Sequence, residues 1–264
     1  MGFFDKYKAE NAGRKAYGLH VVGNRLYDQD KTAEAKAKHE QALKLYEEAI
    51  RGGCTKPSYV MAYGVLLLRF ARFEEAKELF LKADSTPGIT KAEKRQLRIN
   101  FAICQWKLGQ LDSAISNLKI AMSEAPTGML YGSLGYILIE KARQTGDFAE
   151  ALEFNTKALD YDDEDAATLD NYGELMRLRS LRAAEQGDAE AAKALRAQSV
   201  DYYERARKAK PGQITTLYAL ARFAREDGDL ERARELVDRA ILHSGSKVCP
   251  VSLEELQALR AQLD

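Results

Sequence analysis

Small and apolar residues recur along this chain at helical spacing, and the pattern repeats with a long period. Six times an alanine or a serine is followed seven residues later by an alanine, which places both on one face of a helix. The pairs are Ala42/Ala49, Ala76/Ala83, Ala114/Ala121, Ala151/Ala158, Ser199/Ala206 and Ala233/Ala240. The steps from one pair to the next are thirty-four, thirty-eight, thirty-seven, forty-eight and thirty-four positions. A period in this range predicts a stack of helical units.

Each pair lies on the second helix of a predicted hairpin. The first helix carries its own small residue beside bulky ones, as in Tyr63-Gly64 with Leu67. The turns between the two helices lie at 107–111, 145–148 and 227–230. A glycine in each turn can end the first helix in a left-handed conformation, and an aspartate can cap the second. Units end at Pro87, Pro126 and Pro211, because proline interrupts a helix.

The hairpins differ in predicted length. In three of them the two small residues stand twelve positions apart, as from Gly64 to Ala76. The separation is nineteen positions from Gly23 to Ala42 and twenty-six positions from Gly173 to Ser199. Excesses of seven and fourteen residues add about one and about two turns to each helix of the hairpin. We therefore expect the first and fifth hairpins to project beyond their neighbours; a disordered loop insertion is the alternative.

Both ends of the chain carry predicted caps. Ser252 and Glu255 form a capping box, and Leu253, Leu256, Leu259 and Leu263 follow on one helix face. This predicts a terminal helix that covers the last repeat. Phe3, Phe4 and Tyr7 predict a short amphipathic segment that packs on the first unit, with a membrane-surface or partner-binding role as the alternative.

Composition favours one continuous array. The 264 residues are 45% hydrophobic and 30% charged, and no linker rich in proline, glycine or serine divides them. We expect a single array over 1–264, with units at about 15–52, 57–87, 93–126, 128–163, 166–211 and 214–245 and a capping helix at 251–264. Forty basic and forty acidic side chains cancel, which argues against a nucleic-acid partner.

Cysteine usage and the apolar runs predict a cytoplasmic protein. The three cysteines, Cys54, Cys104 and Cys249, form no C-x-x-C pair, which is typical of reduced thiols. The first residues lack the apolar run of a signal peptide. No uncharged stretch approaches the roughly 20 residues of a membrane span.

No arrangement of residues predicts catalysis, a metal site or a cofactor. The histidines His20, His39 and His243 are scattered, and neither a phosphate-binding glycine loop nor a nucleophile elbow is present. The acidic run at 160–165 lacks the glycine and the spaced glutamate of a calcium loop, so it predicts a solvated loop that caps the next helix. We predict that the protein is not an enzyme.

The repeat resembles the tetratricopeptide repeat family, which has W-x2-L-G-x2-Y on the first helix and A-x3-F-x2-A on the second, followed by proline. About six degenerate units between residues 15 and 243 carry the resemblance. No tryptophan occupies the aromatic site of the first helix, where Val60, Arg98, Tyr131, Leu169 and Leu217 stand. Asn155 replaces the aromatic residue of the second helix in the fourth unit. The resemblance implies an all-α, right-handed solenoid of antiparallel helix hairpins with a C-terminal capping helix.

The resemblance also implies a concave groove lined by the first helices, where family members commonly bind peptides or helices. The positions that would face it are apolar in the middle units and become charged toward the C-terminus, at Glu140, Asp170, Glu174 and Arg177. The predicted partner-binding residues are Met61, Val65, Ile99, Ile103, Trp106, Tyr136, Ile139, Arg222 and Arg225. A groove lined by apolar side chains is suited to an amphipathic helix. Burial of these residues by closure of the superhelix or by the N-terminal segment is the alternative.

One subfamily holds a C-terminal carboxylate with lysine, asparagine and arginine side chains. Here Asn24 would match one of those sites, but His20, Val65, Gln96 and Asn100 occupy others, which argues against such a clamp. The predicted function is therefore an interaction scaffold that binds a protein or peptide partner. A self-assembling homo-oligomer is the first alternative; an RNA-binding repeat protein or an enzyme is less favoured.

Overall fold

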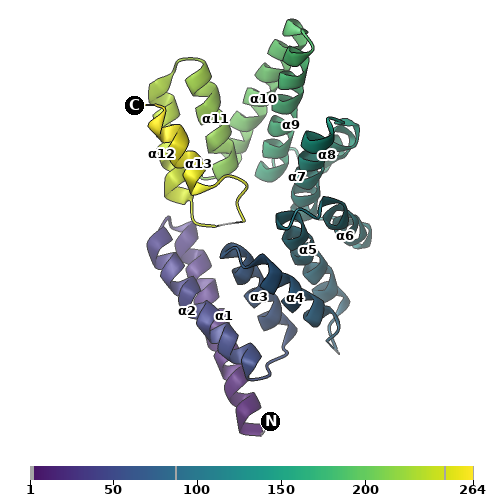
Figure 1. Cartoon of the computed structure of the whole chain (residues 1–264), viewed down its shortest axis with the longest axis vertical. Coiled ribbons are helices and arrows are strands. Elements are labelled where there is room, and N and C mark those ends of the chain that lie inside the picture. Colours follow the sequence, from purple (N-terminus) through teal and green to yellow (C-terminus); the bar gives the residue numbers. More distant parts are fainter. Residues whose placement is uncertain (1–2, 87, 247, 264) are drawn as a thin grey trace. The chain divides into compact units, whose positions relative to one another are not determined.

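The computed structural model describes residues 3–86, 88–246 and 248–263, and within them the chain is helical without a strand (Figure 1). The helices are α1 (Phe3–Asp28), α2 (Thr32–Arg51), α3 (Pro57–Arg69), α4 (Phe73–Asp84), α5 (Lys91–Lys107), α6 (Leu111–Glu124), α7 (Gly128–Thr145), α8 (Ala149–Tyr161), α9 (Ala166–Glu185), α10 (Ala189–Ala209), α11 (Ile214–Glu226), α12 (Leu230–His243) and α13 (Leu253–Ala261). None of the described helices is both long enough and apolar enough to cross a membrane.

The helices form two compact units. The N-terminal unit comprises Met1–Asn117 together with Gly245–Val248, and the C-terminal unit comprises Leu118–Ser244 together with Cys249–Asp264. Consecutive helices pack as hairpins: α1 with α2 and α3 with α4 in the first unit, and α7 with α8, α9 with α10 and α11 with α12 in the second. The all-α solenoid of helix hairpins predicted from the sequence is confirmed.

The six small-residue pairs lie on the buried faces of the second helices. All twelve side chains are buried. The first helices approach them closely: a Cβ atom added to Gly64 would lie 2.1 Å from Cε1 of Phe80, and one added to Gly173 would lie 3.1 Å from the ring of Tyr203. Small residues on both helices thus permit the close contact that the seven-residue spacing predicts.

The predicted turn chemistry is present. Gly109, Gly146 and Gly228 have φ angles of 75°, 77° and 81°, the left-handed conformation expected after a first helix. Asp229 accepts a hydrogen bond from the backbone N–H of Arg232 and so caps α12. The acidic run at 160–165 ends with Asp165, whose side chain caps α9. Pro126 and Pro211 follow the ends of α6 and α10, whereas Pro87 lies outside the described residues.

The extra residues of the first and fifth hairpins are helical, and the first hairpin is longer than predicted. Ala42 comes ten residues after the start of α2, and Ser199 comes ten residues after the start of α10, whereas Ala76 comes three residues after the start of α4. Both long second helices therefore carry seven additional residues, which is about two turns. The predicted single extra turn in the first hairpin is wrong.

The predicted length of the first hairpin was measured from Gly23, but Gly23 does not face Tyr46, the aromatic residue next to the small pair. A Cβ atom on Gly23 would lie 2.4 Å from the ring of His39, nearer the tip of the hairpin. Tyr46, which follows Ala42 by four residues, is buried in the same cluster as Ala16. Ala16 precedes Tyr46 by thirty positions. Gly173 and Tyr203, which face each other in the fifth hairpin, have the same spacing.

The C-terminal helix caps the array as predicted. Ser252 and Glu255 form both hydrogen bonds of the capping box at the start of α13. Leu256, Leu259 and Leu263 are buried in a cluster with α11 and α12, but Leu253 is 38% exposed and does not share that face. The hydrophobic contact therefore begins one turn later than the leucine spacing predicted.

The N-terminal segment is part of a long helix rather than a separate short one. α1 runs without a break from Phe3, and Ala9 packs with Ala49 and Cys54. Tyr7 is 66% exposed, so the predicted packing through this aromatic side chain is wrong. The side chains of Phe3 and Phe4 lie outside the described residues.

Candidate functional site

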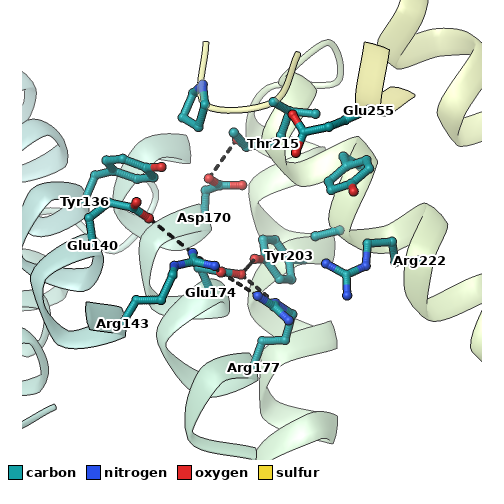
Figure 2. A pocket seen from close by; sticks show the side chains of 14 residues that line it. Tyr136, Glu140, Arg143, Asp170, Glu174, Arg177, Tyr203, Thr215, Arg222 and Glu255 are labelled. Atoms are coloured by element: carbon teal, nitrogen blue, oxygen red, sulfur yellow. Dashed lines mark hydrogen bonds and ion pairs between the residues drawn. The ribbon is translucent and has the colours of Figure 1, made fainter. Parts of the chain in front are cut away.

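A polar cavity of about 270 Å³ lies within the C-terminal unit, on the side formed by its first helices (Figure 2). Its wall comes from α7, α9 and α11, with Tyr203 from α10, and the segment leading into α13 completes it. The lining side chains are Tyr136, Glu140, Arg143, Asp170, Glu174, Arg177, Tyr203, Thr215, Tyr218, Ala219, Arg222, Pro250, Val251 and Glu255. Four carboxylates and three guanidinium groups therefore face one space.

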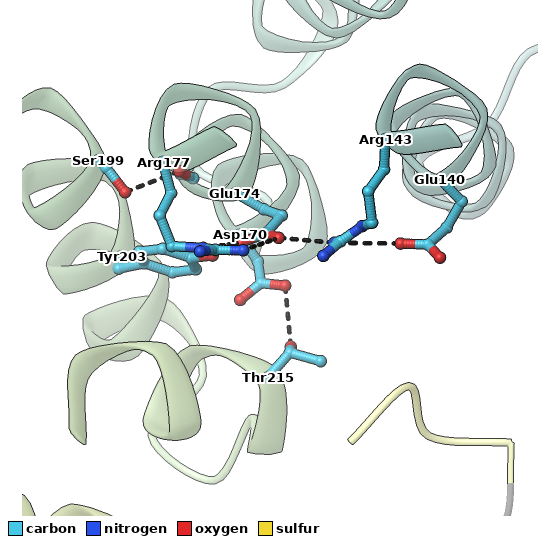
Figure 3. A network of polar contacts seen from close by, with 9 residues as sticks. Glu140, Arg143, Asp170, Glu174, Arg177, Ser199, Tyr203 and Thr215 are labelled. Atoms are coloured by element: carbon cyan, nitrogen blue, oxygen red, sulfur yellow. Dashed lines mark hydrogen bonds and ion pairs between the residues drawn. The ribbon is translucent and has the colours of Figure 1, made fainter. Parts of the chain in front are cut away.

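Glu174 organises one wall of the cavity (Figure 3). Its carboxylate accepts hydrogen bonds of 2.7 Å from Arg143 and from Nε and Nη2 of Arg177, and one of 2.8 Å from the Tyr203 hydroxyl. Arg143 also lies 3.2 Å from Glu140. Burial alone would raise the pKa of Glu174, but the two arginines outweigh burial and lower it. Both arginines are thus committed to this carboxylate.

Asp170 is placed differently, because hydroxyl groups rather than arginines hold it. Thr215 donates to Oδ2 at 2.8 Å and Thr216 donates to Oδ1 at 2.5 Å. The residue is only 7% exposed. Burial raises the pKa of Asp170 to about 6, although the threonine hydrogen bonds act in the opposite direction.

Two of the predicted partner-binding residues, Tyr136 and Arg222, line this cavity from opposite sides (Figure 2). Burial raises the pKa of the Tyr136 hydroxyl. The Arg222 guanidinium lies 5.8 Å from the ring centroid of Tyr218, and the described residues give it no ion-pair partner. One cavity is therefore lined both by an aromatic side chain of α7 and by a cationic side chain of α11, from different hairpins.

Four other predicted residues belong to the N-terminal unit and are half-buried: Met61, Val65, Ile103 and Trp106. Met61 and Ile103 pack against the core of that unit, which is built around Tyr63, Leu67 and Phe80. The Lys107 ammonium lies 4.1 Å from the ring centroid of Trp106. Each of these side chains keeps part of its surface accessible.

Of the remaining three predicted residues, two are buried and the third, Arg225, is half-buried outside the cavity. Ile99 and Ile139 are 4% and 0% exposed, so both are core side chains. Arg225 donates a hydrogen bond to Gln262 beyond the end of α13 and does not line the cavity. Helical spacing places these residues on a first helix, but it does not reveal which neighbouring elements cover them.

Comparison with solved structures identifies the fold. The TPR protein TTC0263 of Thermus thermophilus superposes with a TM-score of 0.51 at 19% identity, over 79% of this chain and 98% of that one. The chain has the tetratricopeptide-repeat fold. Human IFIT1, solved as a dimer with PPP-AAAA, matches with a TM-score of 0.60 at 16% identity, over 84% of this chain and 49% of that one. MamA of Desulfovibrio magneticus RS-1 matches with a TM-score of 0.50 at 17% identity, over 74% of this chain and 96% of that one. No family model and no curated protein sequence matches.

The phase of the repeat predicts part of this cavity and misses the rest of it. Glu140, Asp170, Glu174 and Arg177 lie at first-helix positions that the repeat phase selects, whereas Arg143 lies one turn beyond Glu140. Its position three residues after an acid was a usable signal for an ion pair. The sequence carried no comparable signal for Pro250, Val251 and Glu255. They reach the cavity only because the chain after α12 leads back past it into α13.

Proposed function

We propose that this chain is an interaction scaffold that binds a partner polypeptide through side chains of its first helices, with the cavity of the C-terminal unit as one contact site. The observation that carries the proposal is the convergence of α7, α9 and α11 on one space lined by tyrosines and by charged side chains. Concave sites with a few fixed polar groups are typical of binding sites. The tetratricopeptide-repeat fold supports a scaffold role.

The arrangement favours binding over catalysis. Glu174, Arg143 and Arg177 satisfy one another in fixed hydrogen bonds, which gives the wall a defined shape and leaves none of the three free to transfer a proton. Tyr136 and Arg222, by contrast, present surface to the cavity, and tyrosine and arginine are enriched at binding hot spots. The half-buried apolar side chains of the N-terminal unit, Ile103 and Trp106 among them, are proposed as a second contact surface.

Affinity capture from the native cell tests the proposal. Tyr136→Ala combined with Arg222→Ala should remove at least one partner that the wild type captures and that binds the purified wild-type chain directly. The matched control is Tyr161→Ala with Arg182→Ala, because both of those residues are exposed and lie outside the cavity. The proposal fails for this site if the cavity variant folds and keeps every partner.

Ile103→Glu tests the N-terminal surface in the same assay. Its control is Leu81→Glu, since Leu81 is exposed on α4, a second helix. The molecular mass of the purified chain, measured across a range of concentrations, separates a scaffold for other proteins from a homo-oligomer. A stable dimer that Tyr136→Ala with Arg222→Ala dissociates would favour self-assembly.

A further inference from the structure

The cavity of the C-terminal unit holds one buried acid without a counter-ion. Asp170 lies in its wall and is 7% exposed, and its oxygens accept hydrogen bonds from Thr215 and Thr216. No cation of the described residues lies within ion-pair distance of it. Arg143 and Arg177, which line the same cavity, are bound to Glu174 instead (Figure 3).

Such an arrangement is costly unless a ligand completes it. A buried carboxylate without a cationic partner loses hydration that two hydroxyl donors do not fully replace. The elevated pKa of Asp170, about 6, has this cause. The two threonines nevertheless hold the carboxylate in one orientation at the cavity wall, so it is prepared to receive a donor.

The other charges of the cavity point to the sign of the ligand. Glu140 and Glu255 also line it, and the lining carries one more carboxylate than guanidinium. Arg222, the one lining guanidinium outside the Glu174 network, is half-buried and keeps part of its hydration, whereas Asp170 is only 7% exposed. The unmet requirement of the cavity is therefore a cation.

We propose that the cavity receives a lysine or arginine side chain of the partner polypeptide, with its charged group paired to Asp170. This inference rests on the proposed scaffold function and names the chemistry of its contact. A space of about 270 Å³ is suited to one inserted side chain rather than to a helix. Tyr136 and Tyr218 supply aromatic surface for the aliphatic part of that side chain.

The test uses three capped tripeptides, acetyl-Gly-Lys-Gly-amide, acetyl-Gly-Glu-Gly-amide and acetyl-Gly-Gln-Gly-amide, titrated into the full chain and followed by NMR of the backbone amides. The lysine peptide should shift the signals of Asp170, Thr215 and Thr216 in a saturable way, and the other two peptides should not. Asp170→Asn should lower the affinity for the lysine peptide by about tenfold or more, since a hydrogen bond to a charged group is lost.

Asp201→Asn is the matched control, because Asp201 is exposed on α10 and carries the same charge outside the cavity. The inference is overturned if the glutamate peptide shifts these signals and the lysine peptide does not, or if no peptide shifts them. Unchanged lysine binding in Asp170→Asn overturns it as well. Loss of captured partners in Tyr136→Ala with Arg222→Ala would then still support the scaffold function, so the two failures are distinguishable.

Discussion

Single side chains decide how closely the helices of each hairpin approach. In the second and fifth hairpins a glycine faces an aromatic ring, but in the fourth hairpin Gly135 faces Asn155. The Asn155 amide donates to the carbonyl oxygens of Gly135 at 3.3 Å and Ala151 at 2.8 Å. At the position where the other hairpins have an aromatic ring, Asn155 thus makes a hydrogen bond to the backbone carbonyl of the facing glycine.

Gly64→Ala tests this close packing. The added methyl group would lie 2.1 Å from the Phe80 ring, so the buried ring must move. We expect a loss of about 1–3 kcal/mol in the free energy of unfolding, measured by urea denaturation. Gly18→Ala is the control, because nothing lies within 4 Å of a Cβ atom there. It should be neutral or stabilising by about 0.5–1 kcal/mol; equal losses in both variants would contradict the argument.

Two histidines near the tip of the first hairpin are buried as neutral side chains. The rings of His20 and His39 meet edge to face at a centroid distance of 5.3 Å, and Asn24 lies 3.1 Å from Nε2 of His39. Burial, and secondarily the charge of Arg69, lowers the pKa of both histidines to about 4. Nδ1 of His39 has no hydrogen-bond partner within the described part of the chain, so a proton bound there would have no acceptor.

Acidification should therefore destabilise the protein through these histidines. The unfolded chain takes up protons near pH 6.5 and the folded chain only near pH 4, so stability is complete above pH 6.5 and is lost as the pH falls below it. The expected loss is on the order of 2 kcal/mol per histidine between about pH 7.5 and pH 5.

His39→Gln removes one of the two titrating groups. The difference between its urea-unfolding free energies at the two pH values should be smaller than that of the wild type by about 2 kcal/mol. His243→Gln is the matched control, since His243 lies outside this cluster, at the end of α12. An unchanged pH dependence in His39→Gln would show that its burial is not responsible.

At the scale of the elements, the long hairpins gain length without changing their faces. α2 and α10 each carry seven more residues before the small pair than α4 does. Seven residues are nearly two full turns of an α-helix, so the buried face returns to almost the same direction. An insertion of another length would turn the small residues away from the partner helix.

A deletion in the fifth hairpin tests this reasoning. Removal of 179–185 and 189–195 shortens both helices by seven residues and keeps the turn at 186–188. We expect a cooperatively folded chain whose helical circular-dichroism signal falls only by the share of the deleted residues. Removal of 179–183 and 189–193 is the control: five residues rotate each face by about 140°, and we expect it to lose several kcal/mol of stability. Similar stability of both deletions would contradict the argument.

At the scale of the whole molecule, charge balance argues against RNA as the partner. Basic and acidic side chains number 40 each, and the cavity of the C-terminal unit is lined by more acids than arginines. Proteins that bind RNA usually present a basic surface that releases counter-ions. The likeness to IFIT1, which was solved with PPP-AAAA, is one of fold at 16% identity.

We therefore expect no saturable binding of fluorescent PPP-AAAA to this chain at about 150 mM salt, as measured by anisotropy. Lowering the salt to about 50 mM should produce only weak binding. Saturable binding whose affinity falls steeply and linearly with the logarithm of the salt concentration would contradict this expectation and favour an RNA-binding function.

The sequence by itself determined the helices, their pairing and the positions of the small residues, because these depend on local spacing. The pairs from Ala42/Ala49 to Ala233/Ala240 are buried as their period predicts, and Ser252 with Glu255 caps the last helix. The phase of the repeat also placed Asp170 and Glu174 on the predicted groove-facing side of a first helix, and both line the cavity. For such features, neighbours along the chain supply most of the determining contacts.

Only the tertiary structure decided which of those positions remain accessible and what they bind to. Ile139 and Tyr136 are three residues apart on α7, yet one is buried in the core and the other lines the cavity. Arg143 and Arg177 share Glu174, and the segment at Pro250 completes the cavity wall. These outcomes depend on side chains from different hairpins, and helical periodicity carries no information about which distant residues come together.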